Sequence, residues 1–371
     1  MSTPKLFCAR SLLSRVLLAS SGLACILFFA GSLFGLGVNP VTIASTVPSN
    51  GDVNPYGIAR VPRTTGLLVR GNILVSNFNN SANLQGTGTT IVQITPNGSA
   101  SLFAQIDATT LPGPCPGGIG LTTALAVLRD GWVIVGSLPT SDGTSATAQA
   151  GCLLVLNNQG QVVETFYGSL INGPWDMMAL DGGNTAALFV TNVLNGTVAA
   201  NGKVVHEGTV IRMMLSVSAK TMPNLESITV VGSGFPERSD PAALVIGPTG
   251  LGLSPDGSNL YVADSLSNRI ASISDPLSRI SSAGRGTTIT KGGNLDDPLG
   301  LTVSSDGNIL SVNGNNGYLV ETTPAGLQIA TVLLDSTGNP PGAGALFGLI
   351  SVPGQGIYYV DDASNTLNLL H

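Results

Sequence analysis

Residues 247–270 read GPTGLGLSPDGSNLYVADSLSNRI and contain three marks that return along the chain. A glycine opens a short apolar run, an Asp-Gly pair follows, and a second apolar run ends on Asp264. An Asp-Gly pair between two apolar runs is typical of a tight hairpin turn, because glycine adopts positive φ and aspartate bonds the nearby backbone. The stretch therefore predicts two antiparallel strands joined by a tight turn.

The second run occurs five times at a period of about 50 residues. The copies are ILVSN (73–77), LFVTN (188–192), LYVAD (260–264), ILSVN (309–313) and IYYVD (357–361). Another Asn follows each copy after three or four residues, at Asn80, Asn195, Asn268, Asn316 and Asn365. Such a period predicts a repeat architecture, in which each unit is a small sheet that buries its faces against its neighbours.

The number of units predicts an all-β, six-bladed β-propeller of four-stranded antiparallel blades. Its inner strands are expected at 57–61, 120–128, 175–180, 250–253, 300–303 and 347–352. The last unit is one strand short, whereas the run VTIAST (41–46) has no local partner. We therefore expect this N-terminal strand to complete the last blade and close the ring.

The stretch at 247–270 also resembles the NHL repeat in its Pro-x-Gly opening, Asp-Gly turn, Tyr-Val-Ala-Asp strand and Asn-Arg-Ile close. The other units keep this skeleton in weaker form, so the resemblance covers roughly residues 54–371. Related six-bladed propellers include the gluconolactonase and regucalcin group, the streptogramin lyases and the peptidyl-amidoglycolate lyases. The resemblance implies the fold but leaves the activity open, because hydrolases, lyases and binding modules share it.

Residues 1–38 differ from the propeller expected at 39–371. Lys5, Arg10 and Arg15 precede an uncharged apolar stretch at 16–38. This pattern is typical of a cleaved secretory signal, but the stretch is also long enough to remain as a membrane anchor. Both alternatives place the propeller outside the cytoplasm, either secreted or periplasmic, or tethered to the membrane.

Charge and cysteine content restrict the partners and the compartment. Residues 39–371 carry 12 basic and 21 acidic side chains, a net charge of −9, which argues against nucleic acid as a partner. Cys115 and Cys152 are the only cysteines in this part. In an oxidising compartment we expect them to form a disulfide, and two thiols without a neighbouring His do not suit zinc. We expect a monomer.

The long connections are all expected at one end of the ring, which we call the long-loop end. They span residues 76–88, 136–151, 192–208, 232–247 and 335–345. Binding residues concentrate on loops that a rigid scaffold holds. We therefore expect a small molecule or a protein partner to bind at this end.

The recurring Asn and Asp residues lie at the same end and allow two interpretations. They are Asn77, Asn192, Asp264, Asn313 and Asp361. Each either bonds backbone N–H groups two residues further on, or supplies an oxygen ligand to a shared Ca²⁺. Recurrence in nearly every blade favours the turn interpretation.

The residues near the start of the inner strands vary from blade to blade, as contact residues do. We predict a ligand-binding set of Asn54, Tyr56, Trp175, Asp176, Thr249, Asp297 and Phe347. The metal-dependent lactonases that the fold resembles use a Glu, an Asn and an Asp in the channel. This resemblance implies Asn54, Asp176 and Asp297 as ligands of Ca²⁺ or another divalent cation, although no Glu opens an inner strand here.

Two functions follow from these observations. The favoured function is a non-catalytic module without a cofactor, because charged residues are sparse and no set of catalytic residues is recognisable. His206 is the only histidine besides the terminal His371. The alternative is a metal-dependent hydrolase, lactonase or lyase with a divalent cation in the channel.

Overall fold

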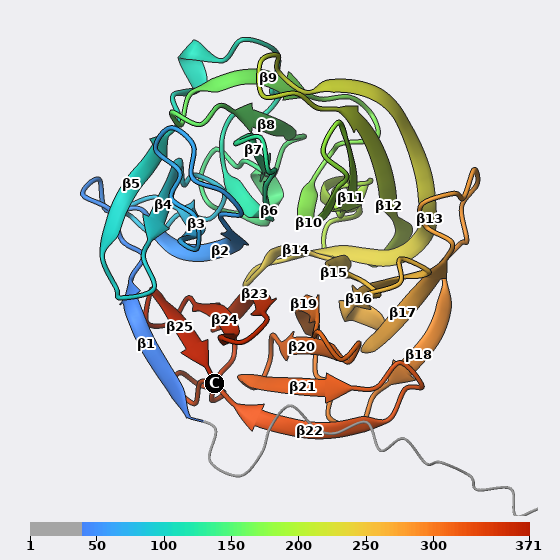
Figure 1. Cartoon of the computed structure of the whole chain (residues 1–371). Helices are drawn as coiled ribbons and strands as arrows, with labels where there is room; N and C mark the ends of the chain where they lie inside the picture. Colours follow the sequence, from blue (N-terminus) through green and yellow to red (C-terminus); the bar gives the residue numbers. More distant parts are fainter. Residues whose placement is uncertain (1–38) are drawn as a thin grey trace, which may run out of the picture. The chain divides into compact units, whose positions relative to one another are not determined.

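The computed structural model describes residues 39–371, which form a ring of six antiparallel sheets (Figure 1). The expected six-bladed propeller is confirmed. Residues 1–38, with the predicted signal or anchor, lie outside the described residues. Within 39–371, no helix is long and apolar enough to cross a membrane.

Each blade runs from an inner strand at the ring axis to an outer strand (Figure 1). Blade one consists of β2 (Val53–Arg60), β3 (Ile73–Asn79), β4 (Thr90–Ile94) and β5 (Ala100–Gln105). Blade two consists of β6 (Leu121–Val127), β7 (Val133–Ser137), β8 (Cys152–Leu156) and β9 (Val162–Phe166). Blade three consists of β10 (Pro174–Asp181), β11 (Thr185–Asn192), β12 (Val205–Ser216) and β13 (Asn224–Asp240), with β14 (Leu244–Ile246) added at the end of β13.

The second half of the ring is more regular. Blade four consists of β15 (Pro248–Leu253), β16 (Asn259–Asp264), β17 (Arg269–Ser274) and β18 (Thr287–Lys291). Blade five consists of β19 (Pro298–Val303), β20 (Ile309–Asn313), β21 (Tyr318–Thr322) and β22 (Gln328–Leu333). Blade six consists of β23 (Leu346–Val352), β24 (Gly356–Asp361), β25 (Thr366–Leu370) and β1 (Pro40–Ser45).

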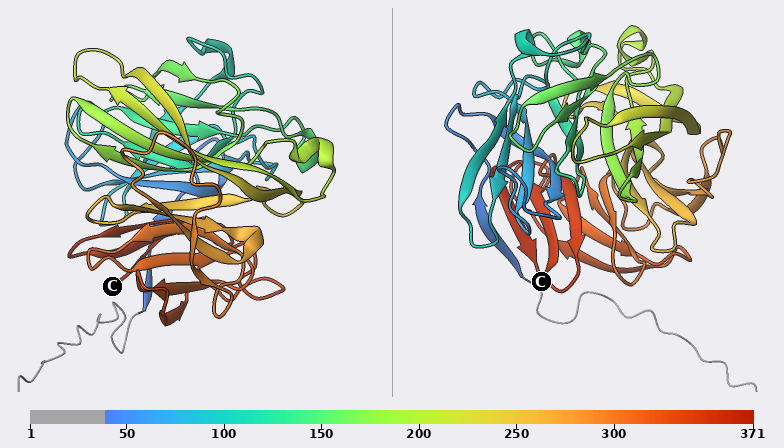
Figure 2. Two further views of the ribbon diagram at one scale, coloured as in Figure 1. Left: turned by 90° about the vertical axis from the view of Figure 1, so that its right-hand side faces the viewer. Right: turned by 45° about the horizontal axis from the view of Figure 1, so that its top comes forward.

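Helices are short and lie in connections. They are η1 (Ala108–Thr110), η2 (Ser145–Thr147), α1 (Thr197–Ala200) and η3 (Ser265–Ser267). The left view in Figure 2 shows the ring from the side, with α1 projecting from one end. Because α1 follows the end of β11, this end is the long-loop end.

The N-terminal strand closes the ring, as expected. β1 pairs antiparallel with β25, and Val41 lies opposite Leu369. The edge that blade six would otherwise expose is thereby covered by a strand from the other end of the described chain.

The glycines of the inner strands are required by close packing around the axis. A Cβ on Gly300 would overlap the carbonyl oxygen of Phe347, and one on Gly348 would overlap that of Tyr56. The inner strands of blades five, six and one therefore approach each other too closely for any side chain at these positions. This contact explains the glycines in the apolar runs of these blades.

The hydrophobic core lies mainly between adjacent blades. Leu153 and Val155 of blade two pack in one cluster with Leu188, Val190 and Ile211 of blade three. All five side chains are fully buried, and each contributes roughly 1.5–3 kcal/mol to stability. The disulfide between Cys115 and Cys152 is also confirmed, with their Cα atoms 5.1 Å apart.

One expected loop is instead a β-hairpin. Within 232–247, β13 continues to Asp240 and β14 returns along it, with Arg238 opposite Ile246. Residues 233–246, which we call the axial hairpin, leave blade three and run toward the ring axis (Figure 1). The expectation of a loop was wrong because Gly234, Pro236 and three charged residues hide the strand periodicity in the sequence.

Candidate functional site

Aromatic side chains meet at the long-loop end of the channel. Tyr56 stacks on Phe347 with ring centroids 3.8 Å apart, and Trp175 lies 6.4 Å from Phe347. The three side chains are only 2–3% exposed. The structure thus brings together three of the seven predicted ligand-binding residues, and they pack against one another.

The axial hairpin covers this aromatic cluster. Leu244, Val245 and Ile246 are at most 3% exposed and belong to the same hydrophobic cluster as Tyr56 and Phe347. In Figure 1, β14 lies close to the ring axis, next to the starts of the inner strands. The channel is therefore closed at the long-loop end by a segment that the sequence analysis had placed in a loop.

Asn54 lies beside this cluster and bonds to a buried carboxyl group. Its amide, with the nitrogen toward Asp362, donates to Asp362 Oδ1 at 2.8 Å and accepts from Asn79 Nδ2 at 3.0 Å. Burial raises the pKa of Asp362 to about 7, and the charge of Asp361 adds to this effect. Burial likewise raises the pKa of Tyr56, and the charge of Asp362 acts in the same direction.

Asp297 lies in a separate cavity of about 510 Å³, which we call the rim cavity. It lies between the axial hairpin and the loops of blades five and six, and its lining includes Arg238, Asp240, Asp296, Asp297, Leu299 and Phe347. Burial, followed by the charges of Asp240 and Asp296, raises the pKa of Asp297 to about 6, while Arg238 opposes the shift.

Asn54 and Asp297 occupy equivalent positions in their blades. Both have positive φ, at 63° and 56°. The N–H of Asn54 donates to Asn365 Oδ1 at 2.7 Å, and the N–H of Asp297 donates to Asn268 Oδ1 at 3.2 Å. In these two blades, the second Asn of the repeat therefore holds the start of the next blade.

Asp176 faces the opposite end of the channel. Its carboxylate accepts from the N–H of Leu251 at 3.0 Å and of Met177 at 2.8 Å. It lines a channel cavity of about 220 Å³ between the inner strands, and burial raises its pKa to about 7. Asp176 and Asp297 therefore line different cavities.

Thr249 is completely buried and joins two blades. Its hydroxyl lies 2.8 Å from Ser265 Oγ and 3.1 Å from the carbonyl oxygen of Pro298, at the start of blade five. Its observed role is to connect blades four and five.

The three residues of the metal alternative are not gathered at one point. Asn54 is bonded to Asp362 and Asn79, Asp176 is bonded by backbone N–H groups, and Asp297 lies in the rim cavity. In the part of the chain from 39 to 371, no group of three or more His, Cys, Asp or Glu side chains is arranged to hold a metal ion. These residues do not fit the ligand set of one shared cation.

The recurring strand-end residues mostly bond between segments rather than within their own turns. Asn77 Nδ2 donates to the carbonyl of Thr46, and Asn313 Nδ2 donates to that of Asn294. Both acceptors lie in segments that cross from one blade to the next. Only Asp361, of the five, accepts from a backbone N–H in its own turn, that of Ser364 at 3.0 Å. The turn interpretation therefore holds for one blade.

Blade four uses its strand-end residue differently. Asp264 is fully buried and pairs with Arg269 at 2.7 Å and with Arg285 at 3.1 Å.

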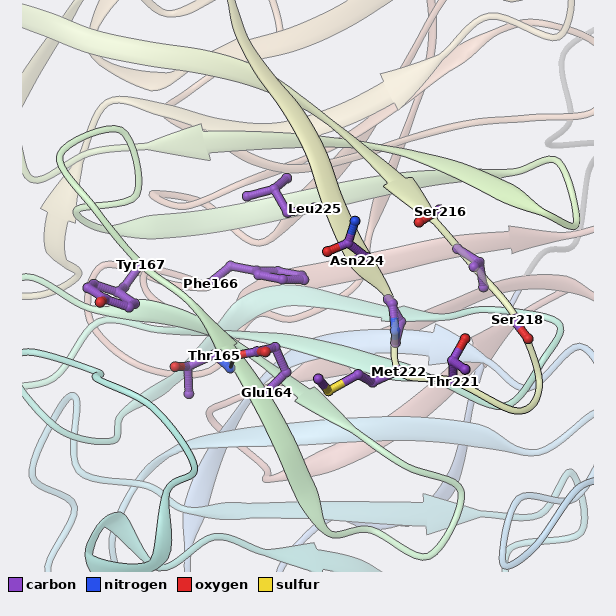
Figure 3. Close-up of a pocket in the computed structure, with 12 residues that line it drawn as sticks. Glu164, Thr165, Phe166, Tyr167, Ser216, Ser218, Thr221, Met222, Asn224 and Leu225 are labelled. Carbon is purple, nitrogen blue, oxygen red and sulfur yellow. Dashed lines mark hydrogen bonds between the residues drawn. The ribbon is translucent and has the colours of Figure 1, made fainter.

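A larger cavity, of about 680 Å³, lies between the outer parts of blades two and three (Figure 3). Its lining comes from the end of β9, including Glu164 and Tyr167, and from the β12–β13 connection, including Met222. Glu164 is its only charged lining residue, and its carboxylate accepts from the N–H of Thr165. The rim cavity combines more polar groups with an apolar floor and is the better candidate site.

Sequence reasoning missed Asp240, Arg238 and Asp362. Asp362 had a visible signal, since IYYVDD is the only copy of the run that ends on two acidic residues. Asp240 and Arg238 had none, because they come to the axis only through the hairpin, where they pair at 2.9 Å.

Comparisons with known proteins agree with the fold. The family model described as "SMP-30/Gluconolactonase/LRE-like region" matches residues 196–340, which is less than half of the chain. A comparison with curated proteins finds no match.

Several solved structures share the fold at low sequence identity. A gluconolactonase from Xanthomonas campestris has a TM-score of 0.55 and 14% identity over 90% of this chain and 89% of its own. Regucalcin from Agrobacterium tumefaciens, a calcium-binding protein, has a TM-score of 0.55 and 13% identity over 88% and 93%. A luciferin-regenerating enzyme has a TM-score of 0.56 and 11% identity over 90% and 95%.

At these identities, the structural likeness supports the fold alone. The chain is thus a six-bladed β-propeller that resembles the SMP-30/gluconolactonase/LRE-like proteins in architecture and, over residues 196–340, in sequence.

Proposed function

We propose that this propeller binds a small organic molecule in the rim cavity. The observation that carries the proposal is the position of Asp297, a partly buried carboxyl group at the wall of a cavity with an apolar floor. A volume of about 510 Å³ lies within the range of small-molecule sites. Leu299 and Phe347 supply apolar contact, while Asp240, Asp296 and Asp297 supply acceptors.

The charge of the cavity favours an organic amine as the ligand. Arg238 is paired with Asp240, and within 39–371 no ion pair involves Asp297. Because the nearby Arg238 is already paired with Asp240, it compensates the partly buried carboxylate of Asp297 only in part, and a ligand that brings a positive charge gains by pairing with it. The ligand class is therefore a primary amine attached to an apolar group.

A pair of probes tests this proposal. We expect benzylamine to bind and benzyl alcohol, which lacks the charge, to bind at least tenfold more weakly by calorimetry. Asp297→Asn should remove this preference. Asp306→Asn is the matched control, because Asp306 is exposed in a tight turn at the opposite end. Equal binding of both probes to the unmodified protein would contradict the proposal.

Lactone hydrolysis is a second candidate, favoured by the family match over 196–340. The pKa of Asp297, about 6, is suitable for a general base near neutral pH. In this reaction, Asp297 takes a proton from water, the water oxygen bonds to the lactone carbonyl carbon, and the ring C–O bond breaks. The ring oxygen takes up a proton, which leaves a hydroxy acid.

Glucono-lactone hydrolysis, followed by acid release, tests this candidate. Asp297→Asn should lower kcat/KM by about 10²–10⁴-fold, while Asp306→Asn should leave it unchanged. A rate with the unmodified protein no higher than in buffer would leave the binding function alone.

We also propose that the propeller acts outside the cytoplasm. The basic and apolar segment at 1–38 and the Cys115–Cys152 disulfide both support export. Cell fractionation and the mass of the mature protein would separate cleaved export from a retained anchor. Recovery of full-length, reduced protein from the cytoplasm would contradict export.

A further inference from the structure

The axial hairpin has a glycine near each of its ends. Gly234, with φ 78°, lies near its start, and Gly247 follows its end. A Cβ on Gly247 would lie 2.8 Å from that of Glu237, so the two arms of the hairpin meet closely there. Hinges are often formed by small residues at the ends of an element, and both glycines are in such positions.

Leu244, the first residue of β14, lies next to the turn of the hairpin and has a strained backbone conformation. Its φ is 63°, and the N–H of Val245 donates to the carbonyl of Ala243 at 2.8 Å, across Leu244. A bond between residues two apart around positive φ marks the rarer and strained form of γ-turn. A bulky, fully buried leucine stays there only because its surroundings hold it, and such strain concentrates at ligand clamps and switches.

The stem of the hairpin also buries polar groups without partners. Glu237 is fully buried, and its Oε1 accepts from the N–H of Asn195 at 3.0 Å. Its Oε2, and the hydroxyl of Ser239, have no hydrogen-bond partner among the described residues. Each of these unpaired groups destabilises the position of the hairpin over the channel, because water would form a hydrogen bond with the group if the hairpin moved away.

Among residues 39–371, one hydrogen bond joins the tip of the hairpin, residues 241–243, to the far side of the ring. Gln85 Nε2, in the long loop of blade one, donates to the carbonyl of Pro241 at 3.1 Å. Pro241 is exposed and Gln85 is half-buried, so water competes for this bond and its net contribution is small. The hairpin is therefore held mainly by the burial of Leu244, Val245 and Ile246 against the aromatic cluster.

We propose that the axial hairpin is a displaceable stopper, and that Leu244 occupies an apolar subsite which accepts the ligand's aryl or branched alkyl group. The walls of this subsite are Tyr56, Trp175 and Phe347, whose rings suit such a group. The subsite adjoins the rim cavity through Phe347, which belongs to both. This inference rests on the proposed function, because the amine of the same ligand pairs with Asp297.

Tryptophan fluorescence of the purified full-length protein gives a direct readout. The chain has two tryptophans, and Trp132→Phe leaves Trp175 as the only one. In this background, Leu244→Gly removes the stopper side chain and relieves its strain. We expect acrylamide quenching of Trp175 to increase several-fold and the neutral apolar probe N-phenyl-1-naphthylamine to bind about tenfold more tightly.

Two further variants serve as a control and as an independent way to release the hairpin. Asp275→Gly relieves a left-handed residue on an exposed loop outside the hairpin and should change neither readout. Gln85→Ala releases the tip without altering the core and should change both in the same direction as Leu244→Gly, by about threefold. Unchanged quenching and probe affinity in both Leu244→Gly and Gln85→Ala would overturn the stopper.

The outcomes also separate this inference from the proposed function. If benzylamine binding is insensitive to Asp297→Asn while Leu244→Gly still opens the apolar subsite, the amine proposal fails and the stopper stands. If the amine binds through Asp297 but Trp175 stays protected in both opening variants, the stopper fails and the amine proposal stands.

Discussion

Blades three and four are neighbours and start from the same repeat, yet they treat a buried carboxylate in opposite ways. In blade four, Asp264 is paired with Arg269 and Arg285. In the extension of blade three, Glu237 forms no ion pair with any residue of 39–371, and burial raises its pKa to about 8. The regular blade thus compensates its buried charge, whereas the irregular blade retains a costly group in the element that covers the channel.

The largest effect is expected from breaking the ion pair of the regular blade. Arg269→Ala removes the 2.7 Å partner of Asp264 and leaves the buried carboxylate with only the more exposed Arg285 at 3.1 Å, which should cost about 3 kcal/mol. Urea unfolding at neutral pH measures this loss. Arg238→Ala, at the half-buried rim pair, is the control and should cost less, about 1 kcal/mol. Similar losses for both variants would mean that blade four does not depend on its buried pair.

The strand-end asparagines allow a similar comparison between a regular blade and blade three, without a charged side chain. Asn313 bonds to the carbonyl of Asn294 and accepts from the N–H of Asp296, so Asn313→Ala should cost about 2 kcal/mol. The side-chain amide of Asn192, in blade three, has no hydrogen-bond partner among the described residues. Asn192→Ala should therefore be nearly neutral or stabilising in the same urea titration. A larger loss at Asn192 than at Asn313 would reverse the comparison.

Measuring the free energy of unfolding as a function of pH tests the buried carboxyl group of Glu237 directly. The pKa of Glu237 is higher in the folded protein than in the unfolded chain, so the folded state holds a proton that the unfolded state releases. Its stabilising contribution is complete below about pH 4.5 and is lost as the pH rises toward about 8. Glu237→Gln should remove on the order of 2 kcal/mol of this pH dependence.

The control for this titration is a neighbouring carboxylate. Glu207, whose charge adds to the shift of Glu237, is exposed, and Glu207→Gln should have a much smaller effect on the slope. If the slope of the free energy of unfolding against pH is unchanged in Glu237→Gln, the pH dependence belongs instead to Asp176 and Asp362, which still titrate in this variant.

The smallest expected effect concerns ligand affinity. The pKa of Asp297 is about 6, so its carboxylate ionises between about pH 5 and pH 7, while benzylamine stays protonated. Benzylamine affinity should therefore rise up to about tenfold across this interval. Asp297→Asn should flatten the profile. A profile that falls with rising pH would contradict pairing between the amine and Asp297.

Much of the ring follows from residues close together in the sequence. The Asp256-Gly257 turn, the run that ends on Asp264 and the glycine before it all express local backbone preferences and strand periodicity. Those signals placed the inner strands and the closing strand β1 correctly, while the disulfide was predicted from the cysteine content of residues 39–371. They also placed Tyr56, Trp175 and Phe347 near the channel mouth, because each lies near the start of an inner strand.

The sequence alone thus determined the six-bladed architecture, since a periodic pattern of turns and apolar runs has one economical way to bury its faces. Only the tertiary structure decided what occupies the axis. The backbone of Asn54 is held by Asn365, 311 positions away, and Asp240 reaches Asp297 only because β13 runs on into the hairpin. Contacts of this kind depend on the path of the whole ring, and no local preference encodes them.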